Sequence, residues 1–283
     1  MHGRLTVPVL ALLALALLAA GPVPARAAEP EIGCVEIPTR APNNPLVKAW
    51  YRVPSSYDPS RRERHRVLVL FGGRNADGRP EVSGKLGWTA WADLNGVFLV
   101  APTLRDDAYW DPKAWSGRAL LDALDALAAK CRVATRGLLF YGYSAGGQLA
   151  ALLQSAPPFP VAAWAVHGCG VFPDPPPRLG APALVSCGIG DSERFTLGRT
   201  FACRYREAGG PLVWKPTRGG HAPDATALAL ARALFAAVAS GAPCARWGED
   251  DTRRLAPREA IDPEYLNPLY DAAVADLWRR DAP

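Results

Sequence analysis

Short apolar runs alternate with longer amphipathic stretches along most of the chain. The apolar runs are continuous and rich in β-branched residues, which is typical of strands buried on both faces of a parallel sheet. The runs predicted to be strands are residues 46–53, 67–71, 97–101, 138–141, 161–166, 183–189 and 212–214. The Ala- and Leu-rich stretches predicted to be helices are residues 88–94, 114–130, 145–154, 193–208 and 225–239. This alternation predicts an α/β protein with a mostly parallel central sheet and helices on both of its faces.

The beginning of the chain has a different pattern. Residues 1–27 start with a short basic stretch, continue with an apolar run over residues 5–20 and end in Ala25-Arg26-Ala27. The apolar run is shorter than the roughly 20 residues of a membrane-spanning helix, and Ala25 and Ala27 supply a small-x-small cleavage pattern. We therefore expect a signal peptide cleaved near Ala27, a secreted or periplasmic protein, and no stable membrane anchor.

The end of the chain also differs from the middle. One globular domain is expected over residues 28–245, followed by a C-terminal extension over residues 246–283. Within the extension, apolar residues recur at helical spacing over residues 262–279, which predicts an amphipathic helix. These residues are Tyr265, Leu266, Leu269, Tyr270, Val274, Leu277 and Trp278. We expect their face to pack on the domain, with binding of a partner protein as the alternative.

Net charge limits the classes of partner. The chain has 32 Lys and Arg against 27 Asp and Glu, and two of the bases and none of the acids lie in residues 1–27, which leaves 30 − 27 = +3. A net charge of +3 is too small to indicate nucleic-acid binding. The basic run at residues 61–66 includes an acid and is expected to be a solvated turn, with His65 exposed.

The six cysteines, all after residue 27, are Cys34, Cys131, Cys169, Cys187, Cys203 and Cys244. An even number in an exported chain favours disulfides, so up to three are expected, with Cys203–Cys244 as the first pair to test. A metal site would need close ligand pairs such as C-x-x-C or two His at helical spacing. Neither pattern occurs, so no metal is predicted.

One short motif carries the candidate chemistry. The predicted strand at residues 138–141 runs into Gly142-Tyr143-Ser144-Ala145-Gly146, and a predicted helix begins immediately. In this strand-turn-helix context, G-x-S-x-G forms a sharp turn that exposes a serine hydroxyl, and small residues are needed where side chains would strike neighbouring elements. We predict that Ser144 is a nucleophile.

A serine hydroxyl needs a base, and the base needs a carboxylate to orient it. His221, shortly after the predicted last strand, is the predicted base. Asp191 directly follows a buried strand and is the predicted acid, although an Asp at a helix start often serves as an N-cap. Asp174, after the preceding strand, is the competing acid. His167 ends a strand at the same edge of the sheet and is expected to line the substrate pocket.

Two backbone N–H groups are required to hold the oxyanion that forms during acyl transfer. Ala145, which begins the helix after Ser144, is predicted to supply one. Gly73, in the loop after the strand at residues 67–71, is predicted to supply the other, and Arg74 beside it is expected to bind substrate. The glycine pairs do not form G-x-G-x-x-G, so no dinucleotide and no organic cofactor is predicted.

Together these motifs resemble those of the α/β-hydrolase superfamily. The resemblance covers most of residues 45–240 and rests on Phe71-Gly72-Gly73, Gly142 to Gly147, Gly190-Asp191 and Gly219-Gly220-His221. Residues 91–102 and the Gly-Tyr-Ser-Ala-Gly-Gly turn look like the secreted branch of polyhydroxybutyrate depolymerases, feruloyl esterases and acetyl xylan esterases. Phe71 departs from that pattern, which often has a His before the oxyanion glycine. The resemblance implies a three-layer α/β-hydrolase fold.

The residues and the resemblance lead to one functional prediction. We expect a secreted serine hydrolase that cleaves a small or polymeric carboxylic ester through an acyl-enzyme. A serine peptidase or an acyltransferase on the same fold remains open, because the same triad serves all three. A non-catalytic binding protein of this fold is a further alternative, but loss of catalysis would be expected to damage at least one of Ser144, Asp191 and His221.

Overall fold

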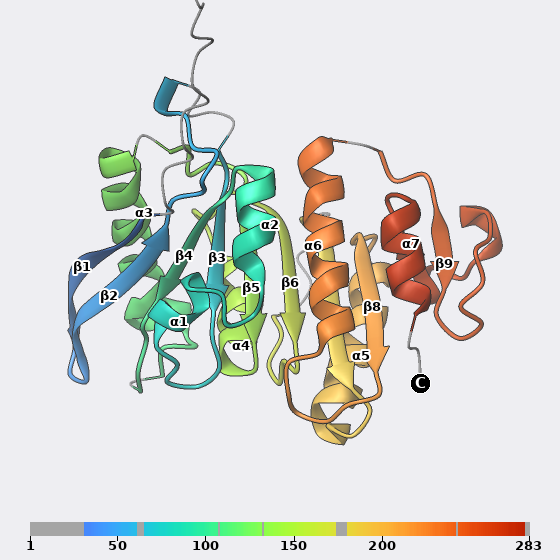
Figure 1. Cartoon of the computed structure of the whole chain (residues 1–283). Coiled ribbons are helices and arrows are strands. Elements are labelled where there is room, and N and C mark those ends of the chain that lie inside the picture. Colours follow the sequence, from blue (N-terminus) through green and yellow to red (C-terminus); the bar gives the residue numbers. More distant parts are fainter. Residues whose placement is uncertain are drawn as a thin grey trace, which may run out of the picture.

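An eight-stranded sheet runs through the molecule with the strand order β1-β2-β4-β3-β5-β6-β7-β8 (Figure 1). The computed structural model describes residues 31–60, 65–106, 108–131, 133–173, 180–241 and 243–280. The predicted signal peptide and the competing acid Asp174 lie outside the described residues. The strands are β1 (Ile32–Ala41), β2 (Asn44–Arg52), β3 (Val67–Phe71), β4 (Phe98–Pro102), β5 (Leu138–Tyr143), β6 (Val161–His167), β7 (Ala183–Gly188) and β8 (Leu212–Thr217).

Most of the sheet is parallel. β1 pairs with β2 and β2 with β4 in antiparallel orientation. The other six strands, in the order β4, β3, β5, β6, β7 and β8, pair in parallel. Every residue of β3, β4, β7 and β8 is buried, which explains the continuous apolar runs of β3 and β4. β7 and β8 also bury the polar side chains of Ser186, Lys215 and Thr217. β1 was not predicted, because it lies at the sheet edge and is mostly exposed or half-buried, so it lacks such a run.

Helices cover both faces of the sheet. They are α1 (Gly78–Val82), α2 (Trp88–Asn95), α3 (Gly117–Cys131), α4 (Ala145–Leu153), α5 (Ser192–Glu207), α6 (Ala225–Ser240) and α7 (Ala272–Arg279). One core lies between the sheet and α3, α4 and α5, and the other lies between the sheet and α1, α2, α6 and α7. The fold is therefore the predicted three-layer α/β arrangement (Figure 1).

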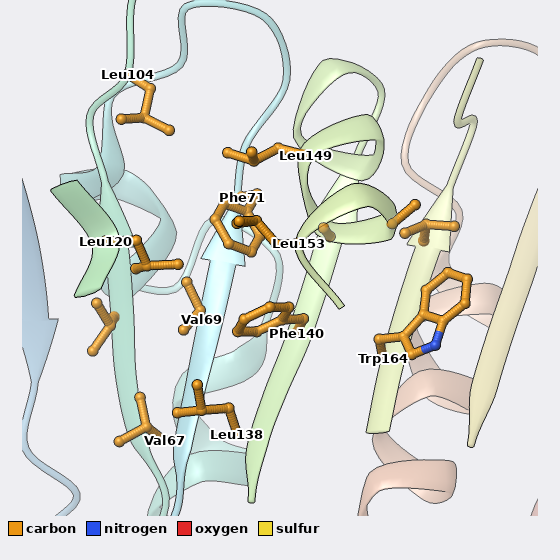
Figure 2. Packing of buried hydrophobic residues seen from close by; sticks show 14 of the residues in the cluster. Val67, Val69, Phe71, Leu104, Leu120, Leu138, Phe140, Leu149, Leu153 and Trp164 are labelled. Atoms are coloured by element: carbon orange, nitrogen blue, oxygen red, sulfur yellow. The ribbon is translucent and has the colours of Figure 1, made fainter. Parts of the chain in front are cut away.

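The side chains of β3 point alternately into these two cores. Val67, Val69 and Phe71 point to the same face, where Figure 2 shows them with Leu149 and Leu153 of α4. The alternate residues of β3 belong to the core that contains Trp88 of α2. Because successive strand residues point to opposite faces, each buried strand contributes to both cores.

The C-terminal extension covers the free edge of β8. It contains the short strands β9 (Trp247–Glu249) and β10 (Leu266–Pro268) and then α7. The side-chain oxygen of Asn267 accepts a hydrogen bond from the backbone N–H of Trp214, and the Trp278 indole donates one to the Trp214 carbonyl. Asn267 and Trp278 are both fully buried. The extension thus satisfies edge groups of β8 that would otherwise be unpaired.

The helix predicted over residues 262–279 is shorter in the structure. Its first part is the short turn Pro263–Tyr265 and β10, and only Ala272–Arg279 is α-helical. Pro268 has no backbone N–H and restricts the residue before it, so a continuous helix is disfavoured here.

The predicted disulfides are absent. All six cysteines are free thiols in the structure, including Cys203 and Cys244. Burial raises the pKa of both Cys169 and Cys187 to about 12, so these two thiols stay protonated and pack as small apolar residues. An even number of cysteines does not show which side chains face each other, so it does not determine whether any pair is close enough to bond.

The expectation that His65 is exposed is wrong. The side chain is buried, its Nδ1 donates to the Gly96 carbonyl, and its Nε2 accepts from the Asp58 N–H. It packs edge-on against Tyr57 and Phe98. His65 therefore belongs to the packed end of the loop before β3.

Candidate active site

Ser144 occupies a strained turn between β5 and α4. Its φ is 55° and its ψ is −122°, a combination that residues with a Cβ rarely adopt. A Cβ on Gly142 would lie 2.4 Å from the Gly146 carbonyl oxygen, and a Cβ on Gly146 would lie 2.2 Å from the Gly72 carbonyl oxygen. Both glycines are therefore required by the close approach of backbone to backbone, as the sequence pattern predicted.

Three predicted residues meet beside this turn. The Ser144 Oγ lies 2.8 Å from His221 Nε2, and His221 Nδ1 lies 2.6 Å from Asp191 Oδ2. The three residues follow β5, β7 and β8, whose carboxyl ends share one edge of the sheet. A carboxylate only accepts hydrogen bonds, so Nδ1 carries the proton and Nε2 can accept the proton of the serine hydroxyl. This arrangement suits Ser144 as nucleophile and His221 as base.

The carboxylate of Asp191 has a second partner. Arg194, on the first turn of α5, donates to Oδ1 at 3.0 Å. Burial favours the neutral acid, but the hydrogen bonds from His221 and Arg194 outweigh it and hold the pKa of Asp191 below its ordinary value. The Asp191 side chain makes no cap hydrogen bond to α5, although the residue stands at the N-cap position. Its carboxylate is therefore used for His221 and Arg194 rather than for capping.

No protein-family model matches the chain, and no curated protein matches it by sequence. Solved structures do match. A poly(3-hydroxybutyrate) depolymerase from Bordetella parapertussis is 19% identical, with 74% of this chain and 89% of that chain covered and a TM-score of 0.53. A ferulic acid esterase is 16% identical, with 75% and 96% covered and a TM-score of 0.57. A poly(aspartic acid) hydrolase from Sphingomonas is 15% identical, with 73% and 97% covered and a TM-score of 0.53.

The chain has the α/β-hydrolase fold. In α/β-hydrolases the nucleophile stands on a sharp strand-to-helix turn, and the acid and base follow it in the chain. Ser144, Asp191 and His221 have this order and this placement.

The two predicted oxyanion donors lie beside the turn that carries Ser144. β3 and β5 are neighbours, with Phe71 opposite Gly142, so the loop after β3 lies against the turn after β5. A Cβ on Gly73 would lie 3.4 Å from the Tyr143 ring, which places Gly73 next to the residue before Ser144. Ala145 is the first residue of α4, and the helix itself supplies no acceptor for the N–H of its first residue. Gly73 and Ala145 therefore both border the turn that carries Ser144, which is compatible with the predicted oxyanion hole.

The two predicted substrate-binding residues differ from each other. Arg74 is exposed, and its guanidinium lies over the Trp110 ring, 5.6 Å from the ring centroid. His167 is instead buried, with 1% of its surface exposed, and both ring nitrogens have protein partners. His167 is therefore placed where substrate would not touch its ring, because the strand end that carries it is covered by the His221 loop.

Sequence analysis missed two side chains that contact the triad. Arg194 lies three residues after Asp191 on α5, a spacing that brings side chains together on one helix face. That spacing is the one sequence signal for it. Tyr143 contacts His221 from 78 residues away in the chain, and no local pattern indicates such a contact.

Among the described residues, no three His, Cys, Asp or Glu side chains form a group that could hold a metal ion. Within the same part of the chain, no helix combines the length and apolar character needed to cross a membrane.

Proposed function

We propose that this chain is a serine hydrolase that cleaves carboxylic esters through an acyl-enzyme intermediate. The observation that carries the proposal is the hydrogen-bonded series from Ser144 through His221 to Asp191, built on a strained turn. A hydroxyl held 2.8 Å from an imidazole nitrogen can lose its proton to that nitrogen as it attacks. The α/β-hydrolase fold and the names of the solved structures that share it support this choice of reaction.

The first half of the reaction makes the acyl-enzyme. Ser144 Oγ attacks the ester carbonyl carbon while His221 Nε2 takes the hydroxyl proton. The oxygen that becomes negative is held by the N–H groups of Gly73 and Ala145, and the Asp191 carboxylate stabilises the imidazolium. The tetrahedral intermediate then collapses, the carbon–alkoxy bond breaks, and His221 returns the proton to the departing alcohol.

The second half releases the acid. Water attacks the Ser144 ester while His221 takes a proton from it, and the same two N–H groups hold the oxyanion. Collapse breaks the bond to Ser144 Oγ, which regains its proton from His221 and leaves a carboxylic acid as the second product. Serine, histidine and aspartate thus end as they began, and no redox reagent is consumed.

Covalent labelling and a substrate panel test this function. The purified chain is treated with a fluorophosphonate, and Ser144→Ala serves as the control. The panel contains acetyl, butyryl, long-chain, feruloyl and 3-hydroxybutyrate esters, each paired with the matching amide because one neighbour is named a poly(aspartic acid) hydrolase. We expect labelling at Ser144 and faster cleavage of esters. A folded protein that is neither labelled nor active would overturn the proposal in favour of a binding role, and faster amide cleavage would favour a peptidase.

We also propose that the chain is exported. The support is the basic, apolar and small-residue pattern of residues 1–27, and an ester polymer outside the cell would then be an accessible substrate. Protein expressed with its own N-terminus in a bacterial host should be recovered from the periplasm or medium and begin at or near Ala28. Recovery in the cytoplasm with residues 1–27 intact would contradict export.

A further inference from the structure

The loop that carries His221 lies at the surface of the protein. Residues 218–223 are all exposed. Gly219 and Gly220 have no atom within 4 Å of the position that a Cβ would take. The loop backbone is tied to the body where Gly190 N–H donates to the Gly219 carbonyl at 3.0 Å. A catalytic base on such a loop needs support from neighbouring elements, because small shifts in its position cost rate.

Tyr143 contacts His221 in two ways. Its hydroxyl donates to the backbone carbonyl of His221 at 2.9 Å. Its ring stacks on the imidazole, with a centroid distance of 5.3 Å and an interplanar angle of 28°. One side chain thus restrains both the backbone and the ring plane of the base. Because Tyr143 directly precedes Ser144, the nucleophile and this support sit on the same strand end.

His167 supports the same arrangement from inside the protein. Its ring stacks on Tyr143, with a centroid distance of 6.2 Å and an interplanar angle of 18°. Its Nε2 lies 2.9 Å from the carbonyl oxygen of Ala222, the residue after His221, and its Nδ1 lies 2.9 Å from Ser186 Oγ. A carbonyl only accepts, so Nε2 is the donor. His167 therefore holds the loop one residue beyond the base.

We propose that Tyr143 is a positioning residue that holds His221 in line with Ser144 and Asp191, and that His167 fixes the other side of the same loop. The proposal rests on the proposed function, because it takes His221 as the base. The Tyr143 hydroxyl is already donated to the His221 carbonyl, which argues against a role as an oxyanion donor. The aromatic face also attracts the imidazolium that forms during reaction, so its effect belongs to kcat more than to KM.

Two substitutions at Tyr143 separate the two contacts. Tyr143→Phe keeps the stacking and removes the hydrogen bond, whereas Tyr143→Leu removes both. Tyr141→Phe is the matched control, since it removes a buried hydroxyl from the same strand without touching the triad. We expect Tyr143→Leu to lower kcat about 10- to 100-fold with little change in KM, since misplacement of about 1 Å costs roughly 100-fold. Tyr143→Phe should recover most of that loss, and Tyr141→Phe should behave as wild type.

A second measurement does not depend on turnover. The proton between His221 Nδ1 and Asp191 gives a low-field proton NMR signal when the hydrogen bond is ordered, and Asp191→Asn identifies it by its loss. We expect the signal to broaden or vanish in Tyr143→Leu while the thermal unfolding transition stays cooperative. If Tyr143→Leu does not fold, Tyr143→Phe and His167→Gln are measured, and both should weaken the signal.

The outcomes are distinct. A folded Tyr143→Leu protein with wild-type kcat and an unchanged low-field signal overturns the positioning role. An unchanged low-field signal in both Tyr143→Phe and His167→Gln would overturn it equally. If the wild-type chain neither reacts with fluorophosphonate nor cleaves any ester, the proposed function fails, and the NMR comparison still decides whether Tyr143 orders His221.

Discussion

Replacing Ser144 by Gly is predicted to leave the protein more stable than replacing it by Ala. Both changes remove the nucleophile. The φ of 55° and ψ of −122° at this residue suit glycine and disfavour any residue with a Cβ. Ser144→Ala removes the same hydroxyl but keeps the Cβ. Comparing the two variants therefore isolates the backbone strain, because the lost hydrogen bond to His221 is common to both.

The size of the difference follows from two opposing effects. A residue held in a sparsely populated backbone region costs about 1–3 kcal/mol, and glycine relieves that cost. Glycine also makes the unfolded chain more flexible, which opposes folding by roughly 0.5–1 kcal/mol. Ser144→Gly should thus exceed Ser144→Ala in stability by about 0.5–2 kcal/mol. For a chain of this size that corresponds to about 1–8 °C in melting temperature.

Thermal melts and urea titrations of the two purified variants measure this difference. Thr200, exposed in the middle of α5, supplies the control, since Thr200→Gly should be about 1 kcal/mol less stable than Thr200→Ala in an ordinary helix. The order of Gly and Ala should therefore reverse between the two sites. If Ser144→Gly melts at or below Ser144→Ala, the turn does not hold the strain that its backbone angles imply.

Four further substitutions probe the acid, the extension and the buried histidine. Asp191→Asn should lower kcat by about 10⁴-fold without unfolding, and Asp174→Asn should lose little; the reverse order would move the acid role to Asp174. Trp278→Ala should cost about 3–5 kcal/mol in urea titrations, since Trp278 is fully buried, and a cost below about 1 kcal/mol would contradict its packing role. Burial lowers the pKa of His167 in the folded protein. As the pH is lowered below the ordinary His pKa of about 6.5, the unfolded chain therefore binds more protons, and the free energy of unfolding decreases by up to about 1.4 kcal/mol per pH unit. His167→Gln should flatten this loss in melts between about pH 7.5 and 5, and an unchanged slope would contradict it.

The sequence by itself determined the fold class and the order of most elements. Strands buried on both faces are apolar at most positions, so they stand out as short apolar runs, and the helices between them show their own period. The turn at Ser144 was also predictable, because the steric need for glycine at residues 142 and 146 is local. Chain order and strand ends then favoured His221 and Asp191 as the partners of Ser144, with Asp174 left as a competing acid.

Tertiary structure alone decided which side chains support that site and which only surround it. Tyr143 and His221 are 78 residues apart, and their contact depends on the register of β5, β7 and β8 rather than on any pattern near either residue. The burial of His65 and His167 depends in the same way on what the sheet packs beside them. The periodicity of a local sequence shows which face of one helix or strand is buried. A contact between distant residues depends on how every element between them is placed, and a local pattern does not contain that information.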